Sequence, residues 1–250
     1  MKRTLPIGVA ILILGLWAAL ATRYPAVLLP SPLEVVVAMA NAPMELLTAT
    51  AITGLSSLLG LVIALGVGLT GAIAFQRFSW LEWALYPYAL ALQTVPIIII
   101  APLLVVWLGY GMPVAIATAA LLAFFPILTG VNLGLRSVPA EQLELFRIHG
   151  ATPRQELRLL RLPHALPYLF TGLRTAVGLS VIGAVVGEFV GSFGRPPSLG
   201  GIAMSSIRGA RTEASFASII LATALALGFF ALVRLAERRM IGSWHPGGNT

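Results

Sequence analysis

The side chains that could carry out chemistry are few in this chain of 250 residues. Cysteine and aspartate are absent, the only lysine is Lys2, and all nine acidic residues are glutamates. Without cysteine the chain forms no disulfide, no thiolate nucleophile and no cysteine zinc site. His149, His164 and His245 lack the spacing of metal ligands, and no serine, histidine and acid constellation is evident. We therefore expect no catalytic residue and no metal site.

A nucleotide-hydrolysing site is excluded for a specific reason. The P-loop of an ATPase needs a Gly-Lys-Ser/Thr sequence to hold phosphates, and its magnesium needs an acidic residue, usually aspartate. No lysine follows Lys2, so the chain cannot supply the first of these. We expect that it binds no cofactor of its own and that any energy from ATP enters through another polypeptide.

Polar groups inside apolar segments are the remaining candidates for function. Glu188 lies near the end of one such segment, where an ionisable group usually faces the bundle interior or water. An ionised Glu188 would repel an anionic solute, which favours a gate role over direct ligation. A hydrogen-bonded structural glutamate or an interfacial one is the alternative. Gln93, Thr94 and Pro96 are further candidates for lining a translocation path.

The composition indicates that membrane helices must position these residues. The chain is 58% hydrophobic and 10% charged, with a mean hydropathy of +0.93, whereas soluble domains are about a quarter charged. About 20 apolar residues cross a bilayer core of about 30 Å. We predict an all-α membrane protein with a single transmembrane domain over residues 1–250. Its six expected spans are Leu5–Ala21, Leu46–Phe75, Leu81–Leu108, Pro113–Leu135, Tyr168–Val190 and Phe216–Leu235.

The third expected span is interrupted by proline. Pro87, Pro96 and Pro102 each remove an amide donor and obstruct the preceding turn. Carbonyls freed at membrane depth must face protein or a water-lined cavity, because lipid cannot satisfy them. This pattern indicates a translocation path, and simple kinked packing is the alternative.

Small residues recur at every fourth position in two expected spans. Such stripes let helix backbones approach closely and gain van der Waals contact. The spacing leaves open whether the partner is another helix of the same chain or a second copy. The stripes are Gly183, Gly187 and Gly191 in the fifth span and Gly60, Ala64, Gly68 and Ala72 in the second.

The distribution of positive charge predicts the orientation. With the N-terminus inside, eleven Lys and Arg residues fall on the cytoplasmic side and four on the outer side. Cytoplasmic loops carry the excess of positive charge, so both termini are predicted in the cytoplasm. The first span follows Lys2 and Arg3 and also has the form of a signal peptide that could be cleaved.

Residues 136–164, named here the insert, are too polar for the membrane. Pro139 suits a helix start, and Gly150 suits a left-handed helix end. Thr152 and Gln155 form the pattern of a capping box that opens a second short helix, which Pro163 is expected to terminate. The insert is therefore predicted to be a helix, a glycine turn and a helix.

The second helix of the insert carries a basic stripe. Arg154, Arg158 and Arg161 are spaced so that they share one face of a helix. Such a stripe beside exposed apolar residues is suited to docking. A DNA groove would need a third helix to support the reader, and no nucleic acid partner is expected. The basic stripe could instead bind anionic lipid headgroups. It could also bind a partner protein.

The insert resembles the EAA loop of ABC-importer membrane subunits. That loop has the pattern Glu-Ala-Ala, three residues, Gly, nine residues and Ile-x-Leu-Pro. Leu145 and Phe146 replace the two alanines, so tight packing of the first helix is the property put in doubt. The matching positions are Glu144, Gly150, Leu162 and Pro163, with Leu160 in place of isoleucine.

The resemblance extends over most of the chain. The stretches "LLPSPLEVV", "LQTVPIIIIAPLLVVWLGYG" and "LPHALPYLFTGLRTAVGLSVIGAVVGEFVGS" are similar to permeases for nitrate, taurine, aliphatic sulfonates, bicarbonate and thiamine-pyrimidine precursors. It implies a type I importer fold in a bacterial cytoplasmic membrane, working as a homodimer with two ATP-binding cassette subunits and an extracytoplasmic solute-binding protein. ATP and magnesium would be bound by the cassette subunits. The residues implied in coupling are Glu144, Phe146, Gly150, Arg154, Leu160, Leu162 and Pro163.

Two other classes of function stay open from the sequence. A secondary transporter or channel driven by ion gradients often has inverted repeats or several ionisable groups within its spans. We detect no clear repeat and only Glu188. A membrane scaffold would need no proline-broken span. The solute itself is not determined, although "LQTVP" favours the pyrimidine-precursor branch over sulfonates.

Overall fold

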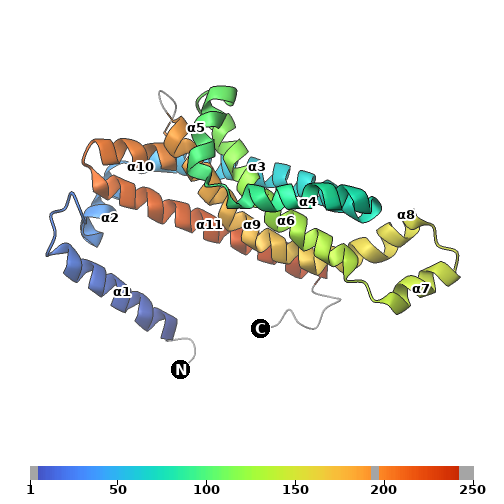
Figure 1. The fold of residues 1–250 in the computed structure, drawn as a ribbon. Helices are drawn as coiled ribbons and strands as arrows, with labels where there is room; N and C mark the ends of the chain where they lie inside the picture. Colours follow the sequence, from blue (N-terminus) through green and yellow to red (C-terminus); the bar gives the residue numbers. More distant parts are fainter. Residues whose placement is uncertain (1–4, 193–196, 242–250) are drawn as a thin grey trace.

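The computed structural model describes residues 5–192 and 197–241, and every regular element among them is a helix. The expected all-α fold is therefore confirmed. Figure 1 shows long helices lying side by side, with a smaller helical extension at one end. The elements are α1 (Leu5–Ala21), α2 (Pro32–Asn41), α3 (Pro43–Arg77), α4 (Ser79–Thr94), α5 (Ile97–Leu108), α6 (Met112–Arg136), α7 (Ala140–Ile148), α8 (Pro153–Glu156), a π-helical segment η1 (Leu157–Arg161), α9 (Leu162–Gly191), α10 (Leu199–Arg208) and α11 (Thr212–Ile241).

The helices α3, α6 and α9 form the centre of the bundle. A Cβ atom placed on Gly183 of α9 would lie 2.6 Å from the Thr118 carbonyl oxygen of α6, so only glycine allows this approach. The Thr118 hydroxyl donates a hydrogen bond to the Gly183 carbonyl across the interface at 2.7 Å. Gly60 of α3 likewise meets Ala119 of α6. Both small-residue stripes therefore pack within the chain, which answers the question that their spacing left open.

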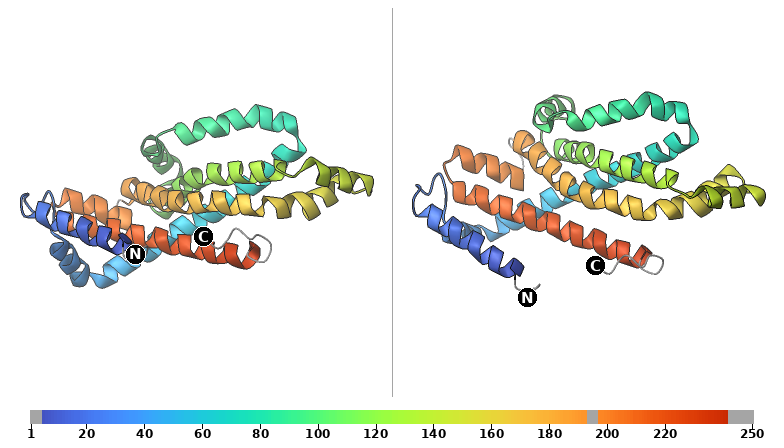
Figure 2. Two further views of the ribbon diagram at one scale, coloured as in Figure 1. Left: turned by 90° about the horizontal axis from the view of Figure 1, so that it is seen from below. Right: turned by 60° about the horizontal axis from the view of Figure 1, so that its bottom comes forward.

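The third expected span is two helices and not one continuous span. The axes of α4 and α5 meet at 102°, and the sharp turn is visible in both views of Figure 2. The break falls at Val95 and Pro96, where Val95 has the extended backbone that a following proline favours. Pro87 and Pro102 lie inside α4 and α5 without ending them.

The number of spans follows from these lengths. Among the described residues, four helices are long and apolar enough to cross a membrane, and the bent α4 and α5 pair gives a fifth. The first expected span is α1, whose 17 residues make it the shortest of the six. Trp17 of α1 stacks on Phe216 of α11 with ring centroids 5.8 Å apart and donates to the Pro30 carbonyl at 3.0 Å. These contacts attach α1 to α11.

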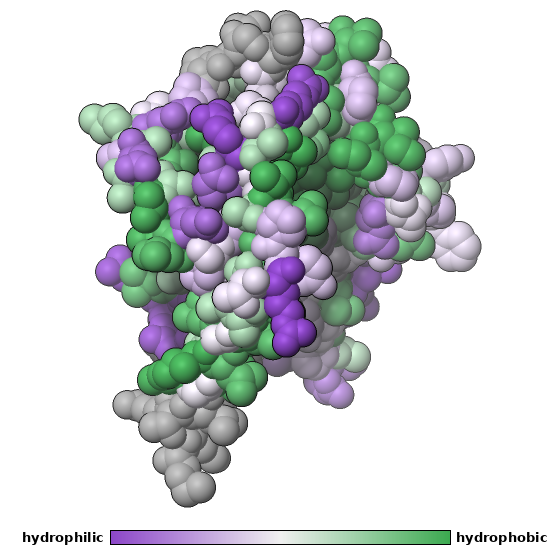
Figure 3. Space-filling model, turned by 90° about the vertical axis from the view of Figure 1, so that its left-hand side faces the viewer, coloured by the Kyte–Doolittle hydropathy of each residue, from purple (hydrophilic) through white to green (hydrophobic). Residues whose placement is uncertain are grey.

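The end of the bundle opposite the insert is built from α2, α10 and the start of α11. An apolar cluster separate from the centre of the bundle holds this end together, and it includes Val35, Leu46, Leu199 and Ile202. Figure 3 looks onto the side where these elements lie and shows hydrophilic side chains spread among apolar ones. We name this end of the molecule the α10 end.

Candidate functional site

The turn between α7 and α8 has a fixed backbone. Gly150 has a φ of +68°, the left-handed conformation that its place after the helix predicted. The Ala151 amide donates to the Phe146 carbonyl at 3.0 Å, which closes the turn. Thr152 then accepts from the Gln155 amide, and the Gln155 side chain accepts from the Thr152 amide, so the predicted capping box is confirmed. The insert is therefore a rigid projection and not a slack loop.

A hollow of about 390 Å³ lies between the two helices of the insert. Its large apolar side chains are open to solvent, with Leu145 55% and Leu159 62% exposed, and His149 and Gln155 add polar groups. Ile148 on the neighbouring face of α7 is 75% exposed. Exposed apolar surface of this kind beside polar residues is typical of an interaction site. The hollow is lined by Leu145, Phe146, His149, Gly150, Ala151, Gln155 and Leu159.

The predicted coupling residues occupy different parts of the insert. Phe146 and Gly150 line the hollow together, whereas Glu144 and Arg154 are exposed outside it. Leu145, which stands where the EAA pattern has an alanine, also lines the hollow and is exposed. The larger side chain therefore extends an exposed face and does not disturb a buried one. Sequence reasoning missed His149 and Leu159, although the apolar type of Leu159 beside the basic positions was a usable signal. The remaining three residues, Leu160, Leu162 and Pro163, are half-buried nearer the bundle.

The sequence predicted that the second helix of the insert ends at Pro163, and this prediction is wrong. The helix continues through η1 into α9, and residues Pro153–Gly191 make one helical run of 39 residues. In η1 the Leu162 amide donates to the Leu157 carbonyl, five residues back. This wider turn takes up the change in hydrogen bonding that Pro163 causes, because proline has no amide to donate. The insert and the longest span are therefore mechanically continuous.

Arg161 does not belong to an exposed basic stripe, contrary to the prediction. Its side chain is only 13% exposed and pairs with Glu156, with 2.7 Å between Arg161 Nη2 and Glu156 Oε1. Arg161 Nη1 also donates to the Leu135 carbonyl at 2.8 Å. Leu135 is in the last turn of α6, whose terminal carbonyls lack partners within the helix. Arg161 thus ties the insert to the end of α6.

Two further ion pairs join helices at this end. Glu82 of α4 pairs with Arg136 of α6 and accepts a hydrogen bond from the side-chain amide of Asn132 at 2.9 Å. Arg174 of α9 pairs with Glu237 of α11. With Arg161, these pairs link α4, α6, α9 and α11 into one connected unit beside the insert.

Glu188 lies at the other end of α9 and is only 4% exposed. Its Oε2 accepts from the Thr53 hydroxyl at 2.8 Å and from the Gly200 amide at 3.1 Å. The Leu199 amide donates in turn to the Thr53 oxygen at 3.0 Å. The carboxylate therefore takes up donors at the start of α10, where free amides favour negative charge. Three helices, α3, α9 and α10, meet at this group.

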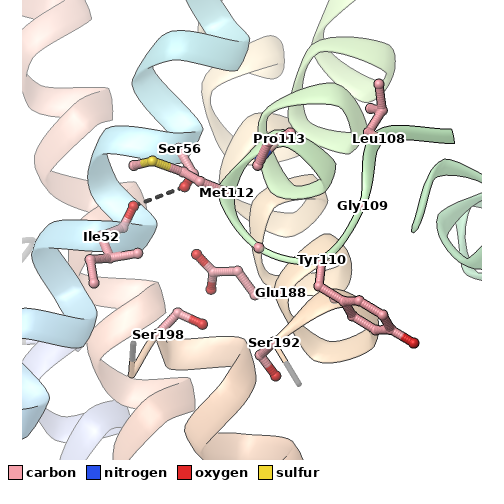
Figure 4. Close-up of a pocket in the computed structure, with 12 residues that line it drawn as sticks. Ile52, Ser56, Leu108, Gly109, Tyr110, Met112, Pro113, Glu188, Ser192 and Ser198 are labelled. Atoms are coloured by element: carbon pink, nitrogen blue, oxygen red, sulfur yellow. Dashed lines mark hydrogen bonds between the residues drawn. The ribbon is translucent and has the colours of Figure 1, made fainter. Parts of the chain in front are cut away.

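A pocket of about 430 Å³ opens beside Glu188, and we name it the Glu188 pocket. Figure 4 shows the Glu188 side chain pointing into the space between α3 and the segment that precedes α6. The Gly111 amide donates to the Gly191 carbonyl at 2.7 Å and holds that segment against α9. The lining residues are Ile52, Ser56, Leu108, Gly109, Tyr110, Gly111, Met112, Pro113, Glu188, Gly191, Ser192 and Ser198.

The other predicted path residues are elsewhere. Gln93 lines a separate hollow of about 150 Å³ beside α6. The Thr94 hydroxyl donates to the Ala91 carbonyl of its own helix at 2.7 Å, and Pro96 is the residue at the break. Within one chain, therefore, the structure does not bring Gln93, Thr94 or Pro96 together with Glu188.

No group of three or more potential metal ligands of the His, Cys, Asp or Glu type occurs within residues 5–192 and 197–241. His245 lies outside the described residues.

Comparison with known proteins gives a consistent result. Residues 56–242 match the family described as binding-protein-dependent transport system inner membrane component. The chain is 32% identical over 245 residues to a probable ABC transporter permease protein of Haemophilus influenzae, covering 97% of this chain and 98% of the relative. It is 39% identical over 168 residues to the formylaminopyrimidine transport permease protein ThiX of Halalkalibacterium halodurans, covering 66% of each.

The fold matches a solved structure as well. An amino acid ABC transporter crystallised with histidines superposes with a TM-score of 0.64 at 17% identity, covering 81% of this chain and 97% of that chain. At this identity the likeness shows the fold alone.

Proposed function

The chain belongs to the family of binding-protein-dependent transport system inner membrane components, and from this premise we propose that it is the translocating subunit of an ATP-driven importer. It is a permease subunit of an ABC transporter. We propose further that it acts as a homodimer in the bacterial inner membrane. Its other partners are two ATP-binding cassette subunits, which bind ATP and magnesium, and an extracytoplasmic solute-binding protein.

The rigid insert is the observation that carries this proposal. A ligand shifts a conformational equilibrium only through different interactions with the two states. The sequence has no site for ATP, so the energy of hydrolysis must arrive through contact with a partner. The insert offers that partner a capped turn at Gly150 and an apolar hollow lined by Phe146. A cassette subunit docked there would hold one end of a helix that continues into the span.

The ion pairs explain how movement of the insert would reach the other helices. Arg161 connects it to α6, and the pairs at Glu82 and Glu237 extend the connection to α4 and α11. The glutamates of these pairs are half-buried, whereas Arg136 and Arg174 are exposed, and the pairs at Glu82 and Glu237 each join two helices. The insert end would therefore move as one body when the cassette subunits close.

The distribution of charge supports a proposed orientation in the membrane. We propose that the insert and both termini are cytoplasmic, because Lys and Arg are concentrated on that side. The α10 end then faces outward, where its mixed polar surface would meet the solute-binding protein (Figure 3). Glu188 is proposed as part of the outer gate, with Gln93, Thr94 and Pro96 lining a deeper part of the path.

The solute class is proposed from a relative. ThiX is named for formylaminopyrimidine, and the "LQTVP" stretch at residues 92–96 also favours a pyrimidine-type solute. A small nitrogen heterocycle is therefore the first solute to test.

Reconstitution tests the proposed function directly. The permease, its cassette subunit and its binding protein are placed in liposomes, and uptake of labelled solute is measured with ATP supplied on the cassette side. The proposal expects uptake that needs both ATP and the cassette subunit. Uptake by the permease alone, driven by an imposed ion gradient, would show instead a secondary transporter.

A further inference from the structure

The two oxygens of the Glu188 carboxylate have different surroundings. Oε2 accepts the hydrogen bonds from Thr53 and Gly200 described above. Oε1 is buried and has no hydrogen-bond partner among the described residues. Buried polar atoms are nearly always paired, and an unpaired carboxylate oxygen is especially unfavourable. Oε1 therefore has no hydrogen bond in this state, although the Ser198 hydroxyl also acts as a donor to this carboxyl group.

A structural role explains only one of these oxygens. Oε2 anchors the start of α10, and the fit is close, since a Cβ on Gly200 would lie 2.7 Å from the Cβ of Glu188. Gln at position 188 would anchor α10 equally well through its amide oxygen. Nothing in this anchoring requires a second acceptor oxygen beside the Glu188 pocket.

The pocket has the size and lining of a small-molecule site. Its volume of about 430 Å³ lies within the range of about 300–1,000 Å³ typical of ligand pockets. The walls include the apolar side chains of Ile52, Leu108, Met112 and Pro113, and the lining residues within 5–192 and 197–241 include no Lys or Arg. Ser56, Ser192 and Ser198 also line the pocket, and Glu188 is the one carboxyl group among its described lining residues. Such a mixed wall suits a compact ring that carries a hydrogen-bond donor. An oxyanion would be repelled by the carboxylate, and none of the described lining residues offers a compensating positive charge.

We propose that the Glu188 pocket is a solute subsite in which Oε1 accepts a hydrogen bond from an N–H group carried on a small ring. The solute class is a neutral or cationic amino-substituted ring, and sulfonates and other oxyanions are rejected. This inference rests on the proposed function, because a solute reaches the pocket only in a translocating subunit. It also gives Glu188 direct contact with the solute in addition to its contact with α10.

Glu188→Gln is the decisive variant. With the amide oxygen in the place of Oε2, the anchor of α10 is kept and an NH₂ group replaces Oε1. The pocket then offers a donor where it offered an acceptor. Thr53→Val is the matched control, because it removes a donor to Oε2 and leaves Oε1 unchanged. The two variants separate the anchoring role from the binding role.

Three probes of similar size test the selectivity: 4-aminopyrimidine, 4-methylpyrimidine and methanesulfonate. Equilibrium binding to the purified complex of permease and cassette subunits is measured without ATP. We expect the wild-type protein to bind the amino compound at least about tenfold more tightly than the methyl compound, which is near the lower limit for one hydrogen bond to a charged group. It should not bind methanesulfonate. Glu188→Gln should abolish that preference, and Thr53→Val should retain it while lowering the thermal unfolding temperature.

Several results would overturn the inference. These are no binding of 4-aminopyrimidine to the wild type, an unchanged preference in Glu188→Gln, or equal loss of preference in both variants. The last result would mean that the carboxylate acts only by holding α10. The binding assay needs no ATP, so a failure of ATP-driven uptake with intact selectivity refutes the proposed function alone. Uptake that works but is indifferent to Glu188→Gln refutes this inference alone.

Discussion

Replacing Gly150 by valine should uncouple ATP hydrolysis from transport. Gly150 has a φ of +68°, and nothing lies within 4 Å of the position that a Cβ would occupy. The substitution therefore introduces no collision with a neighbouring segment. Its effect comes from the backbone alone, because a β-branched residue is strongly disfavoured in the left-handed region.

The magnitude follows from that backbone preference. A left-handed conformation costs a residue with a Cβ about 1–2 kcal/mol relative to glycine. An open turn is free of this strain. Docking in the observed conformation restores it, so the strain lowers the affinity for the partner. An added cost of about 1–2 kcal/mol lowers the docking constant by a factor of about 5–30. The variant should fold, since the spans that form the core are untouched.

The assay compares cassette binding with uptake. Binding of the cassette subunit to the purified permease is titrated, and ATP-driven uptake is measured in liposomes, for wild type, Gly150→Val and Gly150→Asn. Asparagine tolerates the left-handed region and should retain most of the affinity. Gly178→Val in α9 is a second control, because that position also has open space around it but has no positive φ. Unchanged binding and uptake in Gly150→Val would refute the argument that this turn is the docking element.

Three other perturbations test separate parts of the structure. Arg161→Gln should reduce uptake with little loss of cassette binding. The change removes the contacts with Glu156 and the Leu135 carbonyl but leaves the docking face intact. An equal loss of cassette binding would contradict this. Gly183→Val should lower the thermal unfolding temperature of the permease by several degrees, because its Cβ meets α6 at the Thr118 carbonyl, and the Gly178→Val protein is the control for a valine in the same helix. A proton uncoupler should leave ATP-driven uptake in liposomes unaffected, whereas strong inhibition would favour an ion-gradient mechanism.

The features that the sequence predicted correctly are local ones. The left-handed Gly150 and the capping box of Thr152 and Gln155 depend on residues within one turn of each other. Composition over about 20 residues also located four of the six expected spans as long helices, whereas the third is a bent pair of helices and α1 is shorter than a span. The small-residue stripes were also identified, but the choice of α6 as their common partner needed the three-dimensional arrangement.

The errors concern residues whose role depends on distant contacts. Helical spacing placed Arg161 with Arg154 on an exposed face, whereas a carbonyl 26 residues earlier in the chain draws it inward. Pro163 was expected to end a helix, but a π turn absorbs its missing amide. The sequence predicted that proline interrupts the third span but not the angle at Pro96, because proline fixes the local geometry and tertiary packing sets the angle. Glu188 likewise depends on distant contacts, because its hydrogen-bond partners Thr53 and Gly200 lie on other helices.

The continuity of α9 with the insert connects the two candidate regions. One helical run from Pro153 to Gly191 carries the second helix of the insert at its start and Glu188 near its end. At a rise of about 1.5 Å per residue these regions are roughly 50 Å apart, yet no loop separates them. A helix of this length transmits a displacement of the insert to Glu188 only if it moves as a rigid body. The π turn at Leu157–Arg161 is where that rigidity is weakest, and Arg161 spans it by pairing with Glu156 and α6. Arg161 therefore has a mechanical role that its exposed neighbours Arg154 and Arg158 lack, and its loss should weaken the connection between cassette closure and the Glu188 pocket.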